Sequence, residues 1–220
     1  MEQHELETLA NQLACPHGEQ GAELGIKMNA LNTFITQTSI TELAPSANEH
    51  IVEIGFGNGE LSLPVIDLIG AQGHFTGIET SSILAKQAAD KFQDAGITNI
   101  SILQQNCHSA NISASSQDGI FAVNVLYFIF DLQRFFTLLH RWLKPEGRIV
   151  MGIRSKETLQ KMPFTQYGFN LRSQEEYLDA MRNSGLTEVK SSYYDEGLIQ
   201  FGDLELPMDT LILSARKESI

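Results

Sequence analysis

Three glycines at alternate positions, Gly55, Gly57 and Gly59, follow the apolar run 51–54. Glycine weakens both strands and helices, because it adds backbone freedom and has no side chain to pack. Such residues are kept between a strand and a helix where the backbone turns tightly or where another group must approach it. The stretch therefore predicts a strand, a turn and a helix, with a ligand close to the backbone of the turn.

Apolar runs of strand length alternate with amphipathic stretches along most of the chain. Parallel strands are expected at 51–54, 74–78, 100–103, 119–126 and 148–153. Helices are expected at 59–69, 82–94, 132–143 and 174–183. The last two strands, 188–194 and 210–215, lie close enough in sequence to pair antiparallel. This alternation is typical of a doubly wound α/β fold, here a Rossmann-like, seven-stranded and mostly parallel sheet.

The 220 residues suit one α/β domain with a small elaboration. Residues 1–47 are polar and helical in pattern, with a break near Cys15–Pro16, and are expected to form an N-terminal helical cap. Residues 48–220 then form the α/β domain. Within it, 154–172 is expected to be irregular and to cover the substrate.

The balance of charge indicates the class of partner. The net charge is −12, from 15 basic and 27 acidic side chains, whereas nucleic-acid binders usually carry a basic surface. A small-molecule substrate is therefore favoured over nucleic acid. No apolar run approaches the length of a membrane span, and the acidic N-terminus does not resemble a signal peptide. With only two cysteines, a reducing cytoplasm is the expected location.

The spacing of the glycines argues against a dinucleotide. The dinucleotide pattern is G-x-G-x-x-G, and counting from Gly55 its third glycine falls on Glu60. A carboxylate at that position would face a pyrophosphate, which is unfavourable. The Lys-Ser/Thr pair of a phosphate-binding loop is also missing. The turn is therefore predicted to take a ligand without phosphates.

The glycine turn and several later stretches of the chain resemble a known family. Glu53-x-Gly55-x-Gly57-x-Gly59 is similar to motif I of the class I S-adenosylmethionine-dependent methyltransferases, and among them to the small-molecule enzymes of the type 11/25 kind. The stretches GHFTGIETSS (73–82) and LLHRWLKPEGRIVM (138–151) resemble later parts of the same family in the correct order. The resemblance implies S-adenosylmethionine as cofactor and methyl transfer to a small-molecule acceptor.

The resemblance also implies which residues hold the cofactor. By this resemblance, the glycines let the backbone approach the cofactor and Glu79 binds the ribose. A carboxylate suits that role because it can accept both hydrogen bonds of a vicinal diol. Glu53 supports the turn or, through water, the amino acid moiety of the cofactor. Asn106 and Cys107 flank the adenine, with the Asn106 carbonyl near the adenine amino group. The full expected set is Glu53, Gly55, Phe56, Gly57, Gly59, Glu79, Thr80, Asn106, Cys107 and Asn124.

The acceptor side is expected to be formed by the rim after the fourth strand and by two covering segments, 16–34 and 154–172. Asn124 and Tyr127 are predicted to face the transferred methyl group; their spacing is that of the N-P-P-Y motif of amino-group methyltransferases, without its prolines. Aromatic and methionine side chains in the covers suit an apolar or planar substrate. The predicted substrate contacts are Met28, Asn29, Tyr127, Arg154, Phe164 and Tyr167.

Several alternatives stay open from the sequence. The nearest candidates for a base are His17 and His108, and both are expected to be structural or exposed. No metal is expected, because Cys-x-His at 15–17 is not a recognised ligand spacing. A non-catalytic S-adenosylmethionine-binding regulator, an NAD-dependent oxidoreductase and a macromolecular acceptor remain as rivals. The chain is expected to be a monomer or a homodimer.

Overall fold

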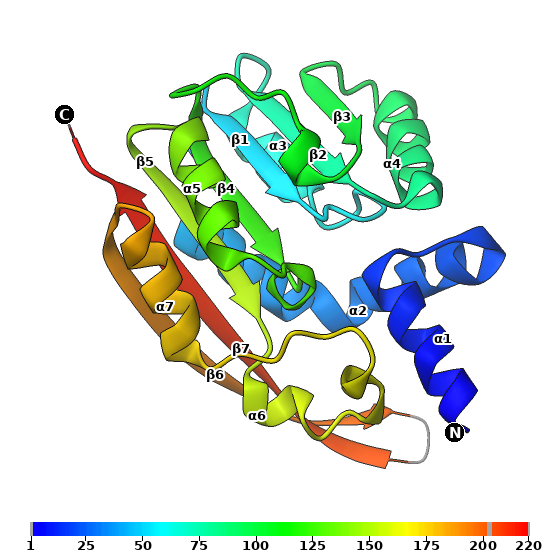
Figure 1. Ribbon diagram of the computed structural model, residues 1–220. Helices are drawn as coiled ribbons and strands as arrows, with labels where there is room; N and C mark the ends of the chain where they lie inside the picture. Colours follow the sequence, from blue (N-terminus) through cyan, green and yellow to red (C-terminus); the bar gives the residue numbers. More distant parts are fainter. Residues whose placement is uncertain (1, 202–203, 220) are drawn as a thin grey trace.

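The computed structural model describes residues 2–201 and 204–219 and contains one seven-stranded sheet (Figure 1). The strand order is β3-β2-β1-β4-β5-β7-β6. The strands are β1 (His50–Ile54), β2 (His74–Glu79), β3 (Ile100–Gln104), β4 (Gln117–Val123), β5 (Leu143–Ile153), β6 (Leu186–Phe201) and β7 (Leu204–Lys217). The first five strands are parallel, and β7 runs antiparallel between β5 and β6. The predicted fold class is confirmed.

Helices cover both faces of the sheet. Seven α-helices are described: α1 (Gln3–Ala14), α2 (Gly18–Leu43), α3 (Leu63–Ile69), α4 (Ser82–Asp94), α5 (Leu132–Trp142), α6 (Lys156–Leu159) and α7 (Gln174–Asn183). Three short 3₁₀ helices follow strands or α6: η1 (Cys107–Ser109), η2 (Leu126–Phe128) and η3 (Pro163–Gln166). Figure 1 shows α2 behind the sheet and α5 and α7 in front of it. In the described part of the chain, no helix is both long and apolar enough to span a membrane.

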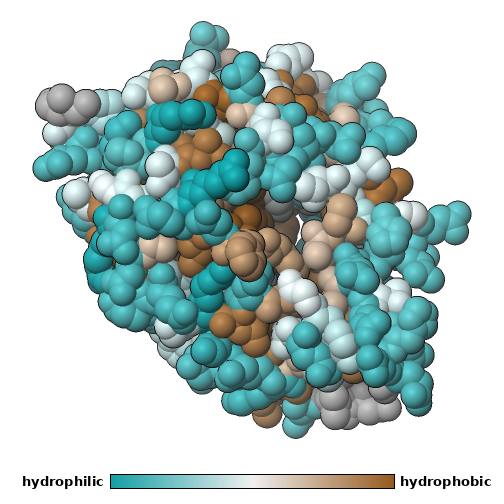
Figure 2. Space-filling view, viewed as in Figure 1, coloured by the Kyte–Doolittle hydropathy of each residue, from teal (hydrophilic) through white to brown (hydrophobic). Residues whose placement is uncertain are grey.

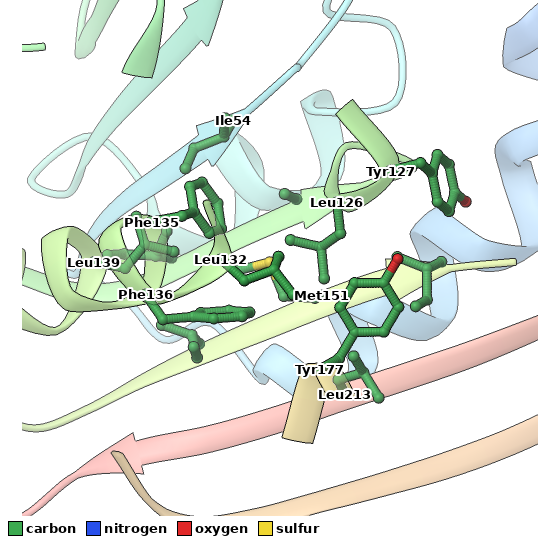
Figure 3. Close-up of a cluster of buried hydrophobic side chains, with 14 of the residues drawn as sticks. Ile54, Leu126, Tyr127, Leu132, Phe135, Phe136, Leu139, Met151, Tyr177 and Leu213 are labelled. Carbon is green, nitrogen blue, oxygen red and sulfur yellow. The ribbon is translucent and has the colours of Figure 1, made fainter. Parts of the chain in front are cut away.

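The two faces of the sheet bury separate hydrophobic clusters, as alternating side chains of a strand require. Ile51 and Phe121 point to the face of α2, α3 and α4, whereas Val52 and Ile120 point to the face of α5 and α7. Figure 3 shows Phe135, Phe136 and Leu139 of α5 packed toward Met151 and Leu213 of the central strands. Full burial of such a side chain contributes roughly 1.5–3 kcal/mol, so these helices are held firmly on the sheet.

Several predictions for single elements were wrong, among them the start of the fifth strand, which is Leu143 and not 148. The helix expected from 59 begins at Leu63, since residues 60–62 form turns and Pro64 occupies the first helical turn. The fourth strand ends at Val123 and not at 126, because Asn124 adopts a left-handed backbone with φ +57°. The segment 154–172 contains α6 and η3 and is not wholly irregular.

The last two strands are much longer than predicted. Only 211–216 of β7 pairs with β5, whereas 204–210 pairs with β6 alone. The two strands therefore form a hairpin that extends beyond the edge of the parallel sheet, as Figure 1 shows. At the other end of the chain, the C-terminal half of α2 packs directly on the sheet through Ile35, Ile40 and Leu43. The division of the chain near residue 47 stays a prediction.

Candidate active site

A cavity of about 630 Å³ lies at the carboxyl ends of the parallel strands. In such sheets this edge is where ligands bind. In Figure 2 the surface is hollowed near the middle of the face shown, with apolar side chains around the hollow. The lining residues fall into two groups by the elements that carry them. We call the part at the carboxyl ends of β1, β2 and β3 the polar end and the part formed by α1, α2, η2, 156–169 and the β6–β7 hairpin the apolar end.

The three glycines of the turn have three different surroundings, although all have a left-handed backbone, with φ between +63° and +74°. A Cβ at Gly57 would meet nothing within 4 Å, and Gly57 lines the cavity. A Cβ at Gly55, which also lines the cavity, would lie 2.6 Å from Val125 Cγ2. A Cβ at Gly59 would lie 2.6 Å from Phe92 Cζ in α4, and Gly59 does not line the cavity. The structure therefore places Gly59 against α4 and outside the cavity lining, unlike Gly55 and Gly57.

Glu79 joins the glycine turn to the end of β2. Its Oε2 accepts a hydrogen bond from the Gly57 backbone N–H at 3.0 Å, and its Oε1 accepts one from the Ser81 backbone N–H at 2.8 Å. The side chain is buried and lines the cavity. Because each carboxylate oxygen can accept more than one hydrogen bond, both remain able to accept from a vicinal diol. This geometry fits the ribose of the expected cofactor.

Glu53 lies below the same turn as a buried carboxyl group. Its Oε2 accepts a hydrogen bond from the Ser62 hydroxyl at 2.5 Å. Burial raises the pKa of Glu53 to about 8; the Ser62 hydrogen bond opposes this rise, and the nearby Glu79 carboxylate adds to it. Glu53 is therefore protonated in the folded protein near neutral pH, which suits a support for the turn.

This protonated carboxyl predicts a dependence of stability on pH. Unfolding returns Glu53 to a pKa near 4.5, so between the two pKa values the unfolded state binds fewer protons than the folded state. The free energy of unfolding should therefore fall by about 2 kcal/mol from pH 6 to pH 8 through this group. Urea unfolding of the wild type and of Glu53→Gln checks this. The variant should lack this share of the decline, and identical slopes for the two proteins would contradict the assignment.

The residues expected beside the adenine follow β3. Asn106 and Cys107 line the cavity, and so does Thr80 after β2. The Asn106 Oδ1 accepts a hydrogen bond from the His108 backbone N–H at 2.9 Å, so this carbonyl caps η1 and the amide N–H groups remain for a ligand. Burial raises the pKa of the Cys107 thiol to about 11, so it stays neutral. His108 does not line the cavity and packs edge-on against Phe135.

A chain of hydrogen bonds crosses the cavity wall between its two ends. The Asn124 Nδ2 donates to Asn32 Oδ1 at 2.9 Å, and the Tyr127 hydroxyl donates to Asn124 Oδ1 at 2.5 Å. The same hydroxyl accepts from the Arg154 backbone N–H at 2.8 Å. All four residues line the cavity, and Tyr127 also stacks on the ring of Phe169. Burial raises the pKa of Tyr127, so its hydroxyl stays protonated and is no base.

Most, but not all, of the residues expected to contact the substrate line the cavity. Met28, Asn29 and Phe164 line the cavity as expected, whereas Tyr167 does not. Arg154 lines it too, but its guanidinium donates to Glu196, to the Asp209 carbonyl oxygen, to the Thr210 hydroxyl and to the Leu31 carbonyl oxygen. The guanidinium therefore holds the hairpin and α2 together.

The sequence reasoning missed two parts of the wall. Ile199 and Met208 come from the β6–β7 hairpin, and Leu9 and Leu13 come from α1. The α1 residues were visible as an apolar stripe at helical spacing, Leu6, Leu9, Ala10 and Leu13. The hairpin residues carried no such signal, since the length of the hairpin was itself underestimated.

Comparison with known proteins finds a matching methyltransferase family model and several methyltransferase relatives. A family model described as a methyltransferase domain matches residues 51–147. An uncharacterised methyltransferase of Bacillus subtilis, YdaC, is 26% identical over 133 residues, which cover 60% of this chain and 71% of that protein. The ubiquinone/menaquinone biosynthesis C-methyltransferase UbiE of Vibrio parahaemolyticus is 26% identical over 126 residues, 56% of this chain and 49% of that one. The chain thus spans about half the length of UbiE.

A solved structure shares the fold over almost the whole chain. The crystal structure of a SAM-dependent methyltransferase from Aquifex aeolicus superposes with a TM-score of 0.67 at 16% identity, covering 96% of this chain and 97% of that one.

Proposed function

We propose that the chain is a class I S-adenosylmethionine-dependent methyltransferase, and that it transfers the methyl group of this cofactor to a small molecule bound at the apolar end of the cavity. The observation that carries the proposal is the continuity of the cavity. One space joins the glycine turn and Glu79 to a wall of apolar side chains beyond Tyr127. A donor and an acceptor can therefore meet inside it.

The polar end fits the cofactor. The bare backbone at Gly57 leaves room for it, the Glu79 carboxylate would accept from its ribose hydroxyls, and the Asn106 amide would lie beside its adenine. When bound, S-adenosylmethionine supplies a methyl group on a positively charged sulfur, which is already activated for transfer. The protein's own residues then need to orient the acceptor and exclude water.

The arrangement supports catalysis by positioning. Among the described lining residues the acidic side chains are Glu53 and Glu79, and both lie at the polar end. The Tyr127 hydroxyl is fixed by Asn124 and by the Arg154 backbone, so it sets the shape of the junction between the two ends. Asn124 and Tyr127 are proposed to face the methyl group from this junction. We also propose that the protein acts in the cytoplasm, as a monomer or a homodimer, on a small molecule.

Binding of S-adenosylhomocysteine, measured by calorimetry with NAD as a control, tests the function. Wild type should bind the sulfur compound at micromolar concentration and should not bind NAD. Glu79→Ala should weaken this binding at least tenfold, since a hydrogen bond to a charged group contributes about 1.5–3 kcal/mol. Glu60→Ala is the matched control. Glu60 is exposed, does not line the cavity and pairs with Lys91 at the surface, so its loss should leave affinity unchanged.

Each result that would contradict the proposal removes a different part of it. Binding of NAD alone would favour an oxidoreductase, and equal affinities for Glu79→Ala and wild type would remove the ribose assignment. Turnover of any acceptor would exclude a non-catalytic regulator.

A further inference from the structure

The apolar end of the cavity is built from segments far apart in the sequence. Its wall includes Leu13 of α1, Met28 of α2, Phe128 of η2, Met162 and Phe164 of the covering segment, and Met208 of the hairpin. Three of the chain's six methionines are in this group. Methionine is flexible and polarizable, so it adapts to irregular apolar ligands. The wall therefore suits a ligand whose surface is mostly carbon.

The polar groups beside this wall are already bonded to one another. The Tyr127 hydroxyl donates to Asn124 and accepts from the Arg154 backbone. The Asn124 amide uses its oxygen for Tyr127 and its nitrogen for Asn32. A carbon surface lying against these groups leaves the hydrogen bonds between them intact, which lowers the cost of burying their polar atoms.

Charge at the apolar end is also balanced. The Arg154 guanidinium forms a buried ion pair with Glu196 and donates to two backbone carbonyls, so it is not free to neutralise an anion. The other basic residue in the described lining is Lys27, which lies exposed on α2. The whole chain carries a net charge of −12, which repels anions at long range.

We infer, on the basis of the proposed function, that the acceptor is an uncharged molecule with a largely hydrocarbon or aromatic body. It enters the apolar end and lies against the Tyr127 junction. An anionic amphiphile, with its head at Lys27, is the competing class, and the experiment separates the two.

Displacement of a neutral fluorescent probe, N-phenyl-1-naphthylamine, tests the inference with S-adenosylhomocysteine present. 1-Decanol should displace the probe at a concentration at least tenfold lower than decanoate. Across 1-hexanol, 1-octanol and 1-decanol the affinity should rise about fourfold per methylene, which corresponds to roughly 0.8 kcal/mol. Decanoate binding as tightly as decanol, or no dependence on chain length, would overturn the inference.

A matched pair of variants tests whether the probe binds at the apolar end of the cavity. Leu13→Asp puts a charge on the apolar wall and should weaken probe binding at least tenfold. Leu68→Asp makes the same change at a half-exposed leucine of α3 outside the cavity and should change nothing. Both should keep the wild-type affinity for S-adenosylhomocysteine, which also shows that they fold. Equal probe affinities in the two variants would refute the site, whereas failure of the wild type to bind S-adenosylhomocysteine would refute the proposed function instead.

Discussion

Gly57→Ala should weaken S-adenosylhomocysteine binding more than 100-fold while the protein stays folded. The Cβ would meet no protein atom within 4 Å, so the change creates no internal clash. Its cost to folding is the left-handed backbone at φ +63°, about 1–2 kcal/mol for a residue with a Cβ. The methyl group would instead occupy the wall of the cavity where the cofactor approaches the turn.

Gly59→Ala is the matched control for this prediction. It carries the same backbone cost, at φ +74°, but its Cβ would lie 2.6 Å from Phe92 Cζ and 3.0 Å from Ala88 Cβ. Overpacking of this kind costs a further 1–3 kcal/mol or so, so this variant should be the less stable of the two. Its folded molecules should bind S-adenosylhomocysteine within about threefold of wild type. Urea unfolding and calorimetry together give both quantities, and an equal loss of affinity in the two variants would contradict the separate roles.

The opposite roles of Gly57 and Gly59 show where the sequence is informative. Strand and helix periodicity predicts the alternation of strands and helices, and so the mostly parallel sheet, because that pattern is set by neighbours in the chain. The positions of Gly57 and Glu79 in the cavity wall could be predicted for a related reason, since Gly57 follows the end of β1 and Glu79 ends β2, at the edge where ligands bind. Gly59 was expected to contact the cofactor like its neighbours, because its closeness to Phe92 in α4 is a feature that no local pattern contains.

The hairpin and Arg154 also depend on contacts between residues far apart in the sequence, which local patterns do not reveal. The first predicted strand ended at 194 and the second began at 210, because the residues between them are mixed in polarity. In the structure the two strands also pair through this part of the chain, and their register shifts between Asp195 and Gly197. The ion pair between Arg154 and Glu196 exists only once this hairpin has formed. From the sequence alone a lone arginine near a cavity resembles a ligand contact, and only the fold reveals its partners.

Arg154→Met should lower the free energy of unfolding by about 3–5 kcal/mol, because it leaves the carboxylate of Glu196 largely buried without its cation. It also removes the donors to the Asp209 and Leu31 carbonyl oxygens, which link the hairpin to α2. Urea unfolding measures the loss. The affinity of the folded variant for S-adenosylhomocysteine should stay close to that of wild type, since the guanidinium is bonded within the wall.

Two further proteins separate this explanation from a direct role in binding. Arg182→Met removes an arginine that pairs with Glu175 and Asp179 at the surface and should cost less than about 1 kcal/mol. Adding Glu196→Gln to Arg154→Met removes the uncompensated charge but keeps an acceptor for the Thr210 hydroxyl, so at least half of the lost stability should return. If Arg154→Met were instead as stable as wild type yet failed to bind the neutral probe, the arginine would contact the acceptor directly. The sequence-based expectation for Arg154 would then be the correct one, and the hairpin would be held by its strand pairing alone.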